Sequence, residues 1–265
     1  NMSSKEIEFL DDGRKRHHQP HLLQLLGALC LDVVYHRAAG DYVYYRDRDG
    51  SEVEVLDLVG GYGSLLLGHS HPALVAEAQR FLSSGRPFHV QGSLRQAAGD
   101  LADELSRRAE GDYCVVFGNS GTEAVEAALK HAMLETGART FLVLENAFHG
   151  KTLGALQLIS NDTFRRPFEL EGLNVVRVRV NDIEHLEATF SQTKDIAGFL
   201  FEPVQGEGGV RLLDRNFVKR AAELCAERRV PLIADECQTG SGRTGRFLAC
   251  QVLGVQPDYV VLSKS

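Results

Sequence analysis

Four side chains suited to binding or catalysis lie just beyond short apolar runs of this sequence. Phe148, Glu202 and Asp235 follow three such runs, and Lys264 follows a fourth close to the last residue. In an open α/β sheet, ligands bind outside the carboxyl ends of the strands, so residues that follow different strands can meet in one site. A carboxylate there is costly unless a cation or a hydrogen-bond donor meets it. These positions therefore predict a site containing carboxylates, an aromatic ring and an amine.

A candidate anion site precedes an expected helix at residues 118–123, Gly-Asn-Ser-Gly-Thr-Glu. Amide groups at the start of a helix have no partner within it, and the hydroxyls of Ser120 and Thr122 add donors around Gly121. The helix dipole favours an anion there by roughly 0.3–1 kcal/mol. Taken alone, an ordinary capped helix start explains the same residues.

Pyridoxal phosphate needs the set of groups that these positions would bring together. It requires a phosphate cradle, a ring that stacks on the pyridine, a carboxylate at the pyridinium nitrogen and a lysine that forms a Schiff base. Considered separately, each group has a simpler explanation: a helix cap, a core aromatic, a surface ion pair or a solvated lysine. The combination at the strand ends of one sheet favours the cofactor.

Two glycine-rich segments resemble other phosphate motifs, and we reject both. Residues 240–245 match G-x-G-x-x-G, but residues 235–239 separate them from the preceding apolar run, and a lone match is weak. Residues 150–152, Gly-Lys-Thr, resemble the end of a P-loop, but Glu145 stands where that motif requires glycine.

From about residue 114 onward, short apolar runs alternate with segments of helical period. This pattern is typical of a parallel sheet covered by helices on both faces, so we expect a doubly wound, mostly parallel α/β fold. Earlier in the chain, residues 42–50 predict a hairpin that turns at Asp49 and Gly50, and residues 72–82 predict a helix. The expected strands are 114–117, 140–144, 174–180, 196–201, 230–234 and 259–262, and the expected helices of this part are 122–133, 182–190 and 214–228.

The composition excludes several classes of protein. Of 265 residues, 43% are apolar and 25% are charged, and the formal net charge of −7 provides no basic surface for nucleic acid or an anionic membrane. No apolar run approaches the roughly 20 residues of a membrane-spanning helix, and the first six residues lack the apolar stretch of a signal peptide. Five widely spaced cysteines argue against disulfides and metal sites and indicate a reducing, cytoplasmic compartment.

Five segments, at residues 119–130, 147–156, 201–209, 234–245 and 255–264, resemble in the same order the motifs of class III pyridoxal-phosphate-dependent aminotransferases. The resemblance extends from about residue 35 to the last residue. It implies the fold type I architecture and a homodimer whose active site lies at the subunit interface. It also implies that residues 1–84 contribute to a smaller α+β domain and the substrate entrance, whereas residues 85–265 belong to the large cofactor-binding domain.

The same resemblance implies a role for each candidate residue. Lys264 would form the Schiff base, Asp235 would pair with the pyridine nitrogen, and Gln238 would approach the phenolic oxygen. Phe148 would stack on one face of the ring and Cys237 on the other, where relatives commonly carry an aliphatic residue. Ser120, Gly121 and Thr122 would bind the phosphate, His149 and Glu202 would complete the cofactor site, and Tyr62, Lys151 and Glu207 would line the substrate side.

The implied reaction moves a terminal amino group from an amine, diamine or ω-amino acid to a keto acid or aldehyde by a ping-pong mechanism. Ornithine-type relatives carry arginine where this sequence has Lys151, and lysine does not replace a bidentate arginine conservatively. The surrounding segment resembles putrescine-type diamine aminotransferases more closely. The alternatives are an acetylornithine or ornithine substrate, another pyridoxal phosphate reaction (aminomutase, racemase or decarboxylase), and an inactive binding fragment.

The position of Lys264, one residue before the last, leads to a final expectation. In the family, this lysine is followed by another strand of the large domain and by a C-terminal part of the small domain. We therefore expect the sequence to lack that part, as a truncated chain, a partial sequence or one piece of a split chain would. A molecule that truly ended at Ser265 would have an exposed apolar sheet edge and little or no activity.

Overall fold

The computed structural model describes residues 20–47, 49–88, 90 and 92–264. The chain divides into two compact units, the first formed by Asn1–Gly60 and Leu67–Arg86 and the second by Gly61–Leu66 and Pro87–Ser265. The residues on which the signal-peptide prediction rests lie outside the described part of the chain.

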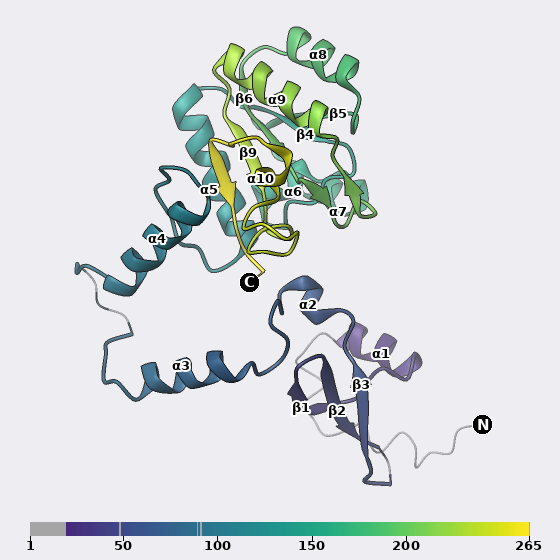
Figure 1. Ribbon diagram of the computed structural model, residues 1–265. Helices are drawn as coiled ribbons and strands as arrows, with labels where there is room; N and C mark the ends of the chain where they lie inside the picture. Colours follow the sequence, from purple (N-terminus) through teal and green to yellow (C-terminus); the bar gives the residue numbers. More distant parts are fainter. Residues whose placement is uncertain (1–19, 48, 89, 91, 265) are drawn as a thin grey trace. The chain divides into compact units, whose positions relative to one another are not determined.

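A five-stranded parallel sheet in the order β10-β9-β6-β4-β5 forms the centre of the second unit (Figure 1). Parallel neighbours need crossover connections, and helices supply them here, so the doubly wound α/β fold expected from the sequence is confirmed. The strands are β4 (Thr140–Leu144), β5 (Asn174–Val178), β6 (Ile196–Phe201), β9 (Leu232–Asp235) and β10 (Tyr259–Val261).

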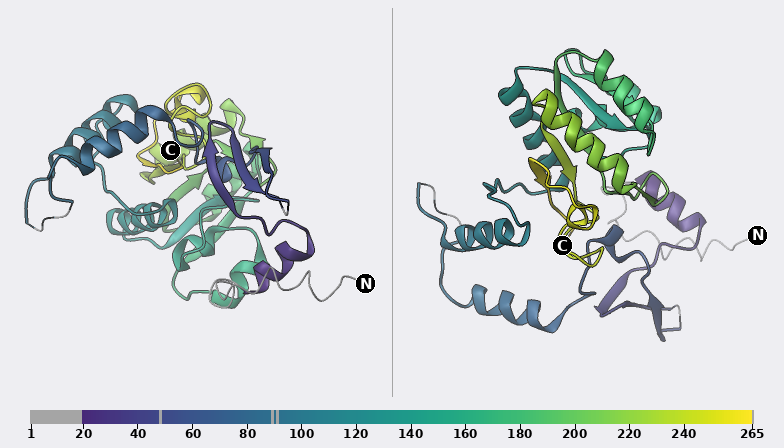
Figure 2. Two further views of the ribbon diagram at one scale, coloured as in Figure 1. Left: turned by 90° about the horizontal axis from the view of Figure 1, so that it is seen from below. Right: turned by 45° about the horizontal axis from the view of Figure 1, so that its top comes forward.

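Successive strand residues face opposite sides of the sheet and enter two separate apolar clusters. Phe141 and Ile233 pack on one side with Leu129 from α5. Leu142 and Phe199 pack on the other side with apolar residues of α8 and α9. Helices therefore lie on both faces of the sheet, as the two views of Figure 2 also show. The covering helices are α5 (Gly121–Thr136), α6 (Leu153–Leu158), α8 (Ile183–Gln192) and α9 (Arg215–Arg228).

The predicted strand at residues 114–117 is wrong. This segment pairs with no strand in the described part of the chain, and Val116 and Phe117 are 65% and 51% exposed. An apolar run becomes a strand only where a neighbour completes its hydrogen-bond ladder, and a single sequence does not reveal that neighbour. The other expected strands of the sheet are present, with β5, β9 and β10 ending within two residues of their expected ends.

The first unit contains a three-stranded antiparallel sheet in the order β1-β2-β3, with the predicted hairpin between β2 and β3. A backbone bridge joins Gly40 to His69, and a Cβ at Gly68 would lie 2.8 Å from the Gly40 carbonyl oxygen. Glycine is therefore required at that close approach. The elements are α1 (Pro20–Ala28), β1 (Tyr35–Ala39), β2 (Tyr42–Arg46), β3 (Glu52–Leu56) and the predicted α3 (Pro72–Leu82).

Apart from α4, the remaining elements are short. Among the described residues, none of the helices combines the length and the apolar character that a membrane span requires. The first of the remaining elements, α2, is a turn of left-handed residues rather than a regular helix. They are α2 (Gly60–Gly63), α4 (Gln96–Arg108), α7 (Asp162–Arg165), η3 (Arg166–Phe168), β7 (Val204–Gln205), β8 (Arg211–Leu212) and α10 (Ala249–Leu253).

Candidate active site

The carboxyl edge of the sheet gathers the residues that follow its strands. Asp235 is the last residue of β9, Glu202 comes directly after β6, and Lys264 lies three residues beyond the end of β10. Phe148 and His149 belong to the loop after β4. Because these strands are parallel, their ends meet at one edge.

Asp235 and His149 form a buried pair at this edge. Asp235 Oδ2 lies 2.7 Å from His149 Nδ1, and the two side chains are 4% and 0% exposed. Burial by itself lowers the pKa of His149, but the hydrogen bond and the charge of Asp235, with a contribution from Glu202, raise that pKa overall. Asp235 Oδ1 also accepts a hydrogen bond from the Cys237 amide at 3.1 Å. The Asp235 carboxylate is thus held in one orientation from both oxygens.

Glu202 is a second buried carboxyl group in the same cluster. It is 7% exposed, and its Oε2 accepts a hydrogen bond from the Phe148 amide at 3.1 Å. Burial raises the pKa of Glu202 to about 7, an effect that the charge of His149 opposes and that of Asp235 reinforces. Glu202 therefore titrates near neutral pH and anchors the Phe148 loop to the end of β6.

The ammonium group of Lys264 lies within electrostatic reach of this cluster, because it acts to lower the pKa of both Glu202 and Cys237. Its backbone φ of +49° is in the left-handed region, which residues other than glycine rarely adopt. For Cys237, burial and then the charge of Asp235 outweigh Lys264 and raise the thiol pKa. The thiol therefore stays neutral and serves as an apolar packing group.

The start of α5 forms a tight cradle at the same edge. Ser120 is the N-cap, and its Oγ accepts a hydrogen bond at 3.3 Å from the amide three residues further on. The amides of Gly121 and Thr122 precede the first bonds of the helix and remain available to an anion. A Cβ at Gly121 would lie 2.8 Å from Cys237 Sγ and 3.1 Å from the Ser263 Cβ, so the cradle has room only for glycine.

Gln238 lies between two loops of the second unit. Its Nε2 donates to the Tyr62 carbonyl at 3.4 Å, and a Cβ at Gly206 would lie 1.8 Å from its Oε1. Tyr62 belongs to the left-handed turn α2, with φ at +55°, and is 73% exposed. The amide of Gln238 is therefore positioned by the backbone of both loops.

Two predicted substrate residues lie apart from these contacts. Lys151 is exposed, and its Nζ lies 4.3 Å from the centre of the Phe164 ring on α7. Glu207 is exposed in the loop that follows β7. Their roles toward a substrate stay predictions.

Three further residues that the sequence did not single out, Glu126, Thr152 and Ser263, lie against the cradle. Thr152 Oγ1 is 2.7 Å from Thr122 Oγ1 and also 2.7 Å from Glu126 Oε1. The i, i+4 spacing of Thr122 and Glu126 places both on one face of α5, and this spacing was the available signal. The contact with Thr152 depends on how the chain folds.

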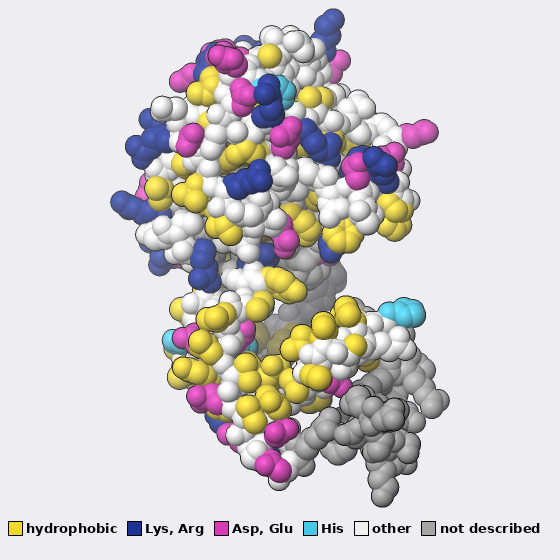
Figure 3. Space-filling view, turned by 90° about the vertical axis from the view of Figure 1, so that its right-hand side faces the viewer, with side chains coloured by type: hydrophobic (Ala, Val, Ile, Leu, Met, Phe, Trp, Pro, Cys, Tyr) yellow, Lys and Arg dark blue, Asp and Glu magenta, His cyan; other side chains and the backbone are white. Residues whose placement is uncertain are grey.

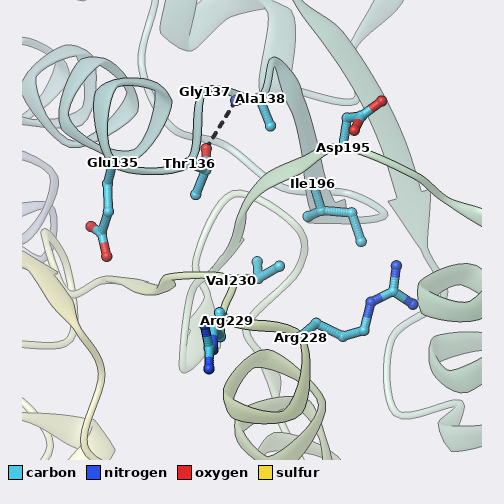
Figure 4. A pocket seen from close by; sticks show the side chains of 9 residues that line it. All are labelled: Glu135, Thr136, Gly137, Ala138, Asp195, Ile196, Arg228, Arg229 and Val230. Atoms are coloured by element: carbon cyan, nitrogen blue, oxygen red, sulfur yellow. Dashed lines mark hydrogen bonds between the residues drawn. The ribbon is translucent and has the colours of Figure 1, made fainter.

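A shallow pocket elsewhere on the second unit lies at the opposite edge of the sheet (Figure 4). Its lining includes Ala138, which precedes β4, Ile196 at the beginning of β6, and Val230, which precedes β9. Residues that precede parallel strands gather at the amino edge, so this pocket is separate from the cluster around Asp235.

Comparison with known proteins decides the family. Residues 27–265 match the family model described as Aminotransferase class-III. The chain is a class III aminotransferase by family. Its relatives include the aminotransferase PigE of a Serratia species, 38% identical over 260 residues, and the putrescine aminotransferase of Pectobacterium atrosepticum, 41% identical over 222 residues. These alignments cover 96% and 80% of this chain but only 30% and 47% of the relatives, so the chain spans less than half of either.

Solved structures of aminotransferases share the fold of this class III chain. The ornithine aminotransferase of Toxoplasma gondii has a TM-score of 0.79 and 29% identity, covering 97% of this chain and 62% of its own. An amine transaminase from an uncultivated Pseudomonas species, solved in its pyridoxal-phosphate-bound form, has a TM-score of 0.74 and 29% identity, covering 88% of this chain and 58% of its own.

The residues of this class III aminotransferase fit pyridoxal phosphate, the cofactor of the family. The cradle at Gly121 excludes a side chain but leaves amides free, as a phosphate requires. The buried Asp235 offers a fixed acceptor for a protonated ring nitrogen, and the buried Nε2 of His149 has no partner in the described residues. No group of three or more His, Cys, Asp or Glu among those residues could hold a metal ion.

Proposed function

We propose that the protein containing this chain transfers a terminal amino group from an amine, diamine or ω-amino acid to a keto acid or aldehyde acceptor. The observation that carries the proposal is the meeting of Lys264, the buried Asp235–His149 pair and the Gly121 cradle at one edge of the sheet. A covalent attachment point, an acceptor for a ring nitrogen and a phosphate cradle together serve no simpler purpose.

When bound, pyridoxal phosphate supplies an electron sink for the carbon that carries the amino group. Lys264 would hold the cofactor covalently and, once displaced by the substrate amine, would take a proton from that carbon and deliver it to the C4′ carbon of the cofactor. Asp235, oriented by His149, would keep the ring nitrogen protonated through a charge-assisted hydrogen bond. Gln238 would face the phenolic oxygen, and Phe148 would stack on the ring opposite Cys237.

Residue 151 is a lysine, which cannot hold a substrate carboxylate through two parallel hydrogen bonds as arginine does. This favours a substrate whose terminal amine reacts without such a clamp on a carboxylate. Lys151 offers a single ammonium group, and in this structure that group lies over the Phe164 ring. The 41% identity to the Pectobacterium putrescine aminotransferase points the same way. Tyr62 and Glu207, both exposed, would contribute to the substrate side.

An amine-donor profile of the purified protein tests this function. With a keto acid as acceptor, we expect turnover of diamines such as putrescine and of ω-amino acids, and accumulation of the amino form of the cofactor when the acceptor is withheld. Strict dependence on ornithine or acetylornithine would contradict the substrate assignment. Turnover without amino-group transfer would instead indicate an aminomutase, racemase or decarboxylase reaction.

An ornithine substrate is the second candidate. The 29% identity and the TM-score of 0.79 with the Toxoplasma gondii ornithine aminotransferase favour it. Replacing Lys151 with arginine discriminates between the two: it should increase the preference for ornithine over putrescine if the present lysine disfavours a carboxylate there.

We further propose that the protein is a cytoplasmic homodimer with its active site at the subunit interface. Apolar side chains remain exposed in both units, among them Leu58 (86%), Phe88 (73%) and Leu94 (102%). In Figure 3, hydrophobic side chains gather in the lower part of the view, on the first unit. Such surfaces mark interaction sites. Residues 1–84 would contribute to the smaller domain and residues 85–265 to the large one. The molar mass of the full-length protein measured by light scattering tests the dimer.

A further inference from the structure

Glu126 joins helix α5 to the loop at residues 148–152. Its Oε1 accepts three hydrogen bonds, from Thr152 Oγ1 at 2.7 Å, from the Gly154 amide at 2.7 Å and from the Ala155 amide at 3.0 Å. These amides begin α6, whose own N-cap residue Thr152 makes no side-chain cap bond. Glu126 therefore caps α6 from a neighbouring helix.

The hydrogen bonds of Glu126 determine the donor and the acceptor at each step of a short series of hydrogen bonds. Thr122 Oγ1 and Thr152 Oγ1 are 2.7 Å apart, and each hydroxyl has one proton. Thr152 donates its proton to Glu126, because a carboxylate oxygen that already accepts two amide bonds has none to give. Thr122 must then donate to Thr152, so the series runs from Thr122 through Thr152 to Glu126.

Two glycines show that this arrangement is held by close packing as well. A Cβ at Gly150 would lie 2.2 Å from Thr122 Oγ1, and a Cβ at Gly154 would lie 2.3 Å from Glu126 Oε2. Since a real Cβ needs more than about 3.0 Å, the backbone of the loop at Gly150 and that of α6 at Gly154 approach the two α5 side chains as closely as glycine allows. The loop that carries Phe148 is thereby joined to the start of the phosphate cradle.

We infer that Glu126 is a positioning residue, which holds Thr152 and the start of α6 against α5. We also infer that Thr122 binds the phosphate through its main-chain amide, whereas its hydroxyl donates its hydrogen bond to Thr152. Ser120 differs, because its Oγ accepts a hydrogen bond from the Glu123 amide and keeps its own proton free to donate. This inference rests on the proposed cofactor site for its phosphate part, but the contacts of Glu126 exist without the cofactor.

The first test measures hydrogen–deuterium exchange of the full-length protein without cofactor. In Glu126→Ala, the Gly154 and Ala155 amides should exchange at least about tenfold faster, because each loses an acceptor that carries charge. Glu126→Gln keeps an oxygen acceptor and the side-chain shape, so a smaller increase is expected, and it serves if the alanine variant does not fold. Glu135→Gln, at the other end of α5, is the matched control and should leave both amides unchanged. Unchanged exchange in both Glu126 variants would overturn the positioning role.

The second test compares the dissociation constants of pyridoxal phosphate and pyridoxal, which lacks the phosphate, for the protein and its variants. Glu126→Ala should weaken pyridoxal phosphate binding about tenfold. Thr122→Val, which keeps shape and amide, should change the ratio of the two constants by less than about threefold, because the hydroxyl does not serve the phosphate.

If Thr122→Val reduced the preference for pyridoxal phosphate over pyridoxal tenfold, the inference about the hydroxyl would be overturned. Thr152→Ser, which retains this series of hydrogen bonds, should bind both ligands like the unaltered protein. If the unaltered protein bound neither ligand, the proposed function would be refuted. The hydrogen–deuterium exchange experiment, which needs no cofactor, would still test the positioning role of Glu126.

Discussion

His149 Nδ1 lies 2.7 Å from Asp235 Oδ2, and this pair is buried where the loop after β4 meets the end of β9. The side chains are 86 residues apart in sequence. Their contact orients the carboxylate assigned to the cofactor nitrogen. It also places a buried proton-binding group, His149, directly behind that carboxylate.

Asp235→Asn should remove the charge that stabilises the imidazolium of His149. Burial then dominates, so the His149 pKa should fall below its ordinary value of 6.5. In the unaltered protein the pKa of His149 is raised. The contribution of His149 to the free energy of unfolding is therefore complete below pH 6.5 and is lost as the pH rises through the pKa of the folded state. NMR titration of the His149 ring measures the change.

The matched control for that variant is Asp182→Asn. Asp182 is the N-cap of α8, and its Oδ1 accepts a hydrogen bond from the His185 amide. It should leave the His149 titration unchanged. A His149 pKa that is equally high in Asp235→Asn would mean that another group holds the proton.

Glu202→Gln should change how stability depends on pH. The pKa of Glu202 is raised from 4.5 to about 7, so its contribution is complete below pH 4.5 and disappears as the pH rises through 7. Over that interval the unaltered protein should lose about 3 kcal/mol of unfolding free energy relative to the glutamine variant. Urea unfolding of both proteins without cofactor, from pH 4.5 to 8, measures the difference. Parallel curves for the two proteins would contradict the assigned pKa.

Lys264→Ala should abolish the yellow Schiff-base absorbance of the protein with bound pyridoxal phosphate and reduce amino-group transfer by at least about a hundredfold. Lys219→Ala, on α9, is the control and should retain both. An absorbance spectrum with and without cofactor measures the first effect, and the rate of amino-group transfer to a keto acid measures the second. A band that survives in Lys264→Ala would refute the role of that lysine.

Gly121→Ala should weaken pyridoxal phosphate binding and destabilise the fold by about 1–3 kcal/mol, because the new methyl group would meet Cys237 Sγ at 2.8 Å. Gly99→Ala provides the control: it lies in α4 with open space around it, and should be neutral or stabilise by up to about 1 kcal/mol. Thermal unfolding and cofactor titration of both variants measure the two effects. Equal behaviour of the two variants would show that the cradle tolerates a side chain.

Much of the fold could be predicted because apolar periodicity is a local property. The runs at 140–144 and 196–201 became β4 and β6 with the expected bounds, and parallel strands bring their following residues to one edge. The run at 114–117 is also apolar but forms no strand, since strand formation depends on a neighbouring strand that the apolar pattern does not specify.

The residue types, their order along the chain and the family that they resemble can be read from the amino-acid sequence. Which of these residues touch depends on the folded chain: His149 contacts Asp235, Phe148 contacts Glu202, and Thr152 contacts Glu126. Helical period and strand alternation act over a few residues, whereas these contacts join segments 26 to 86 residues apart. Such contacts, and the pKa of a group such as Glu202, depend on burial that the whole fold creates.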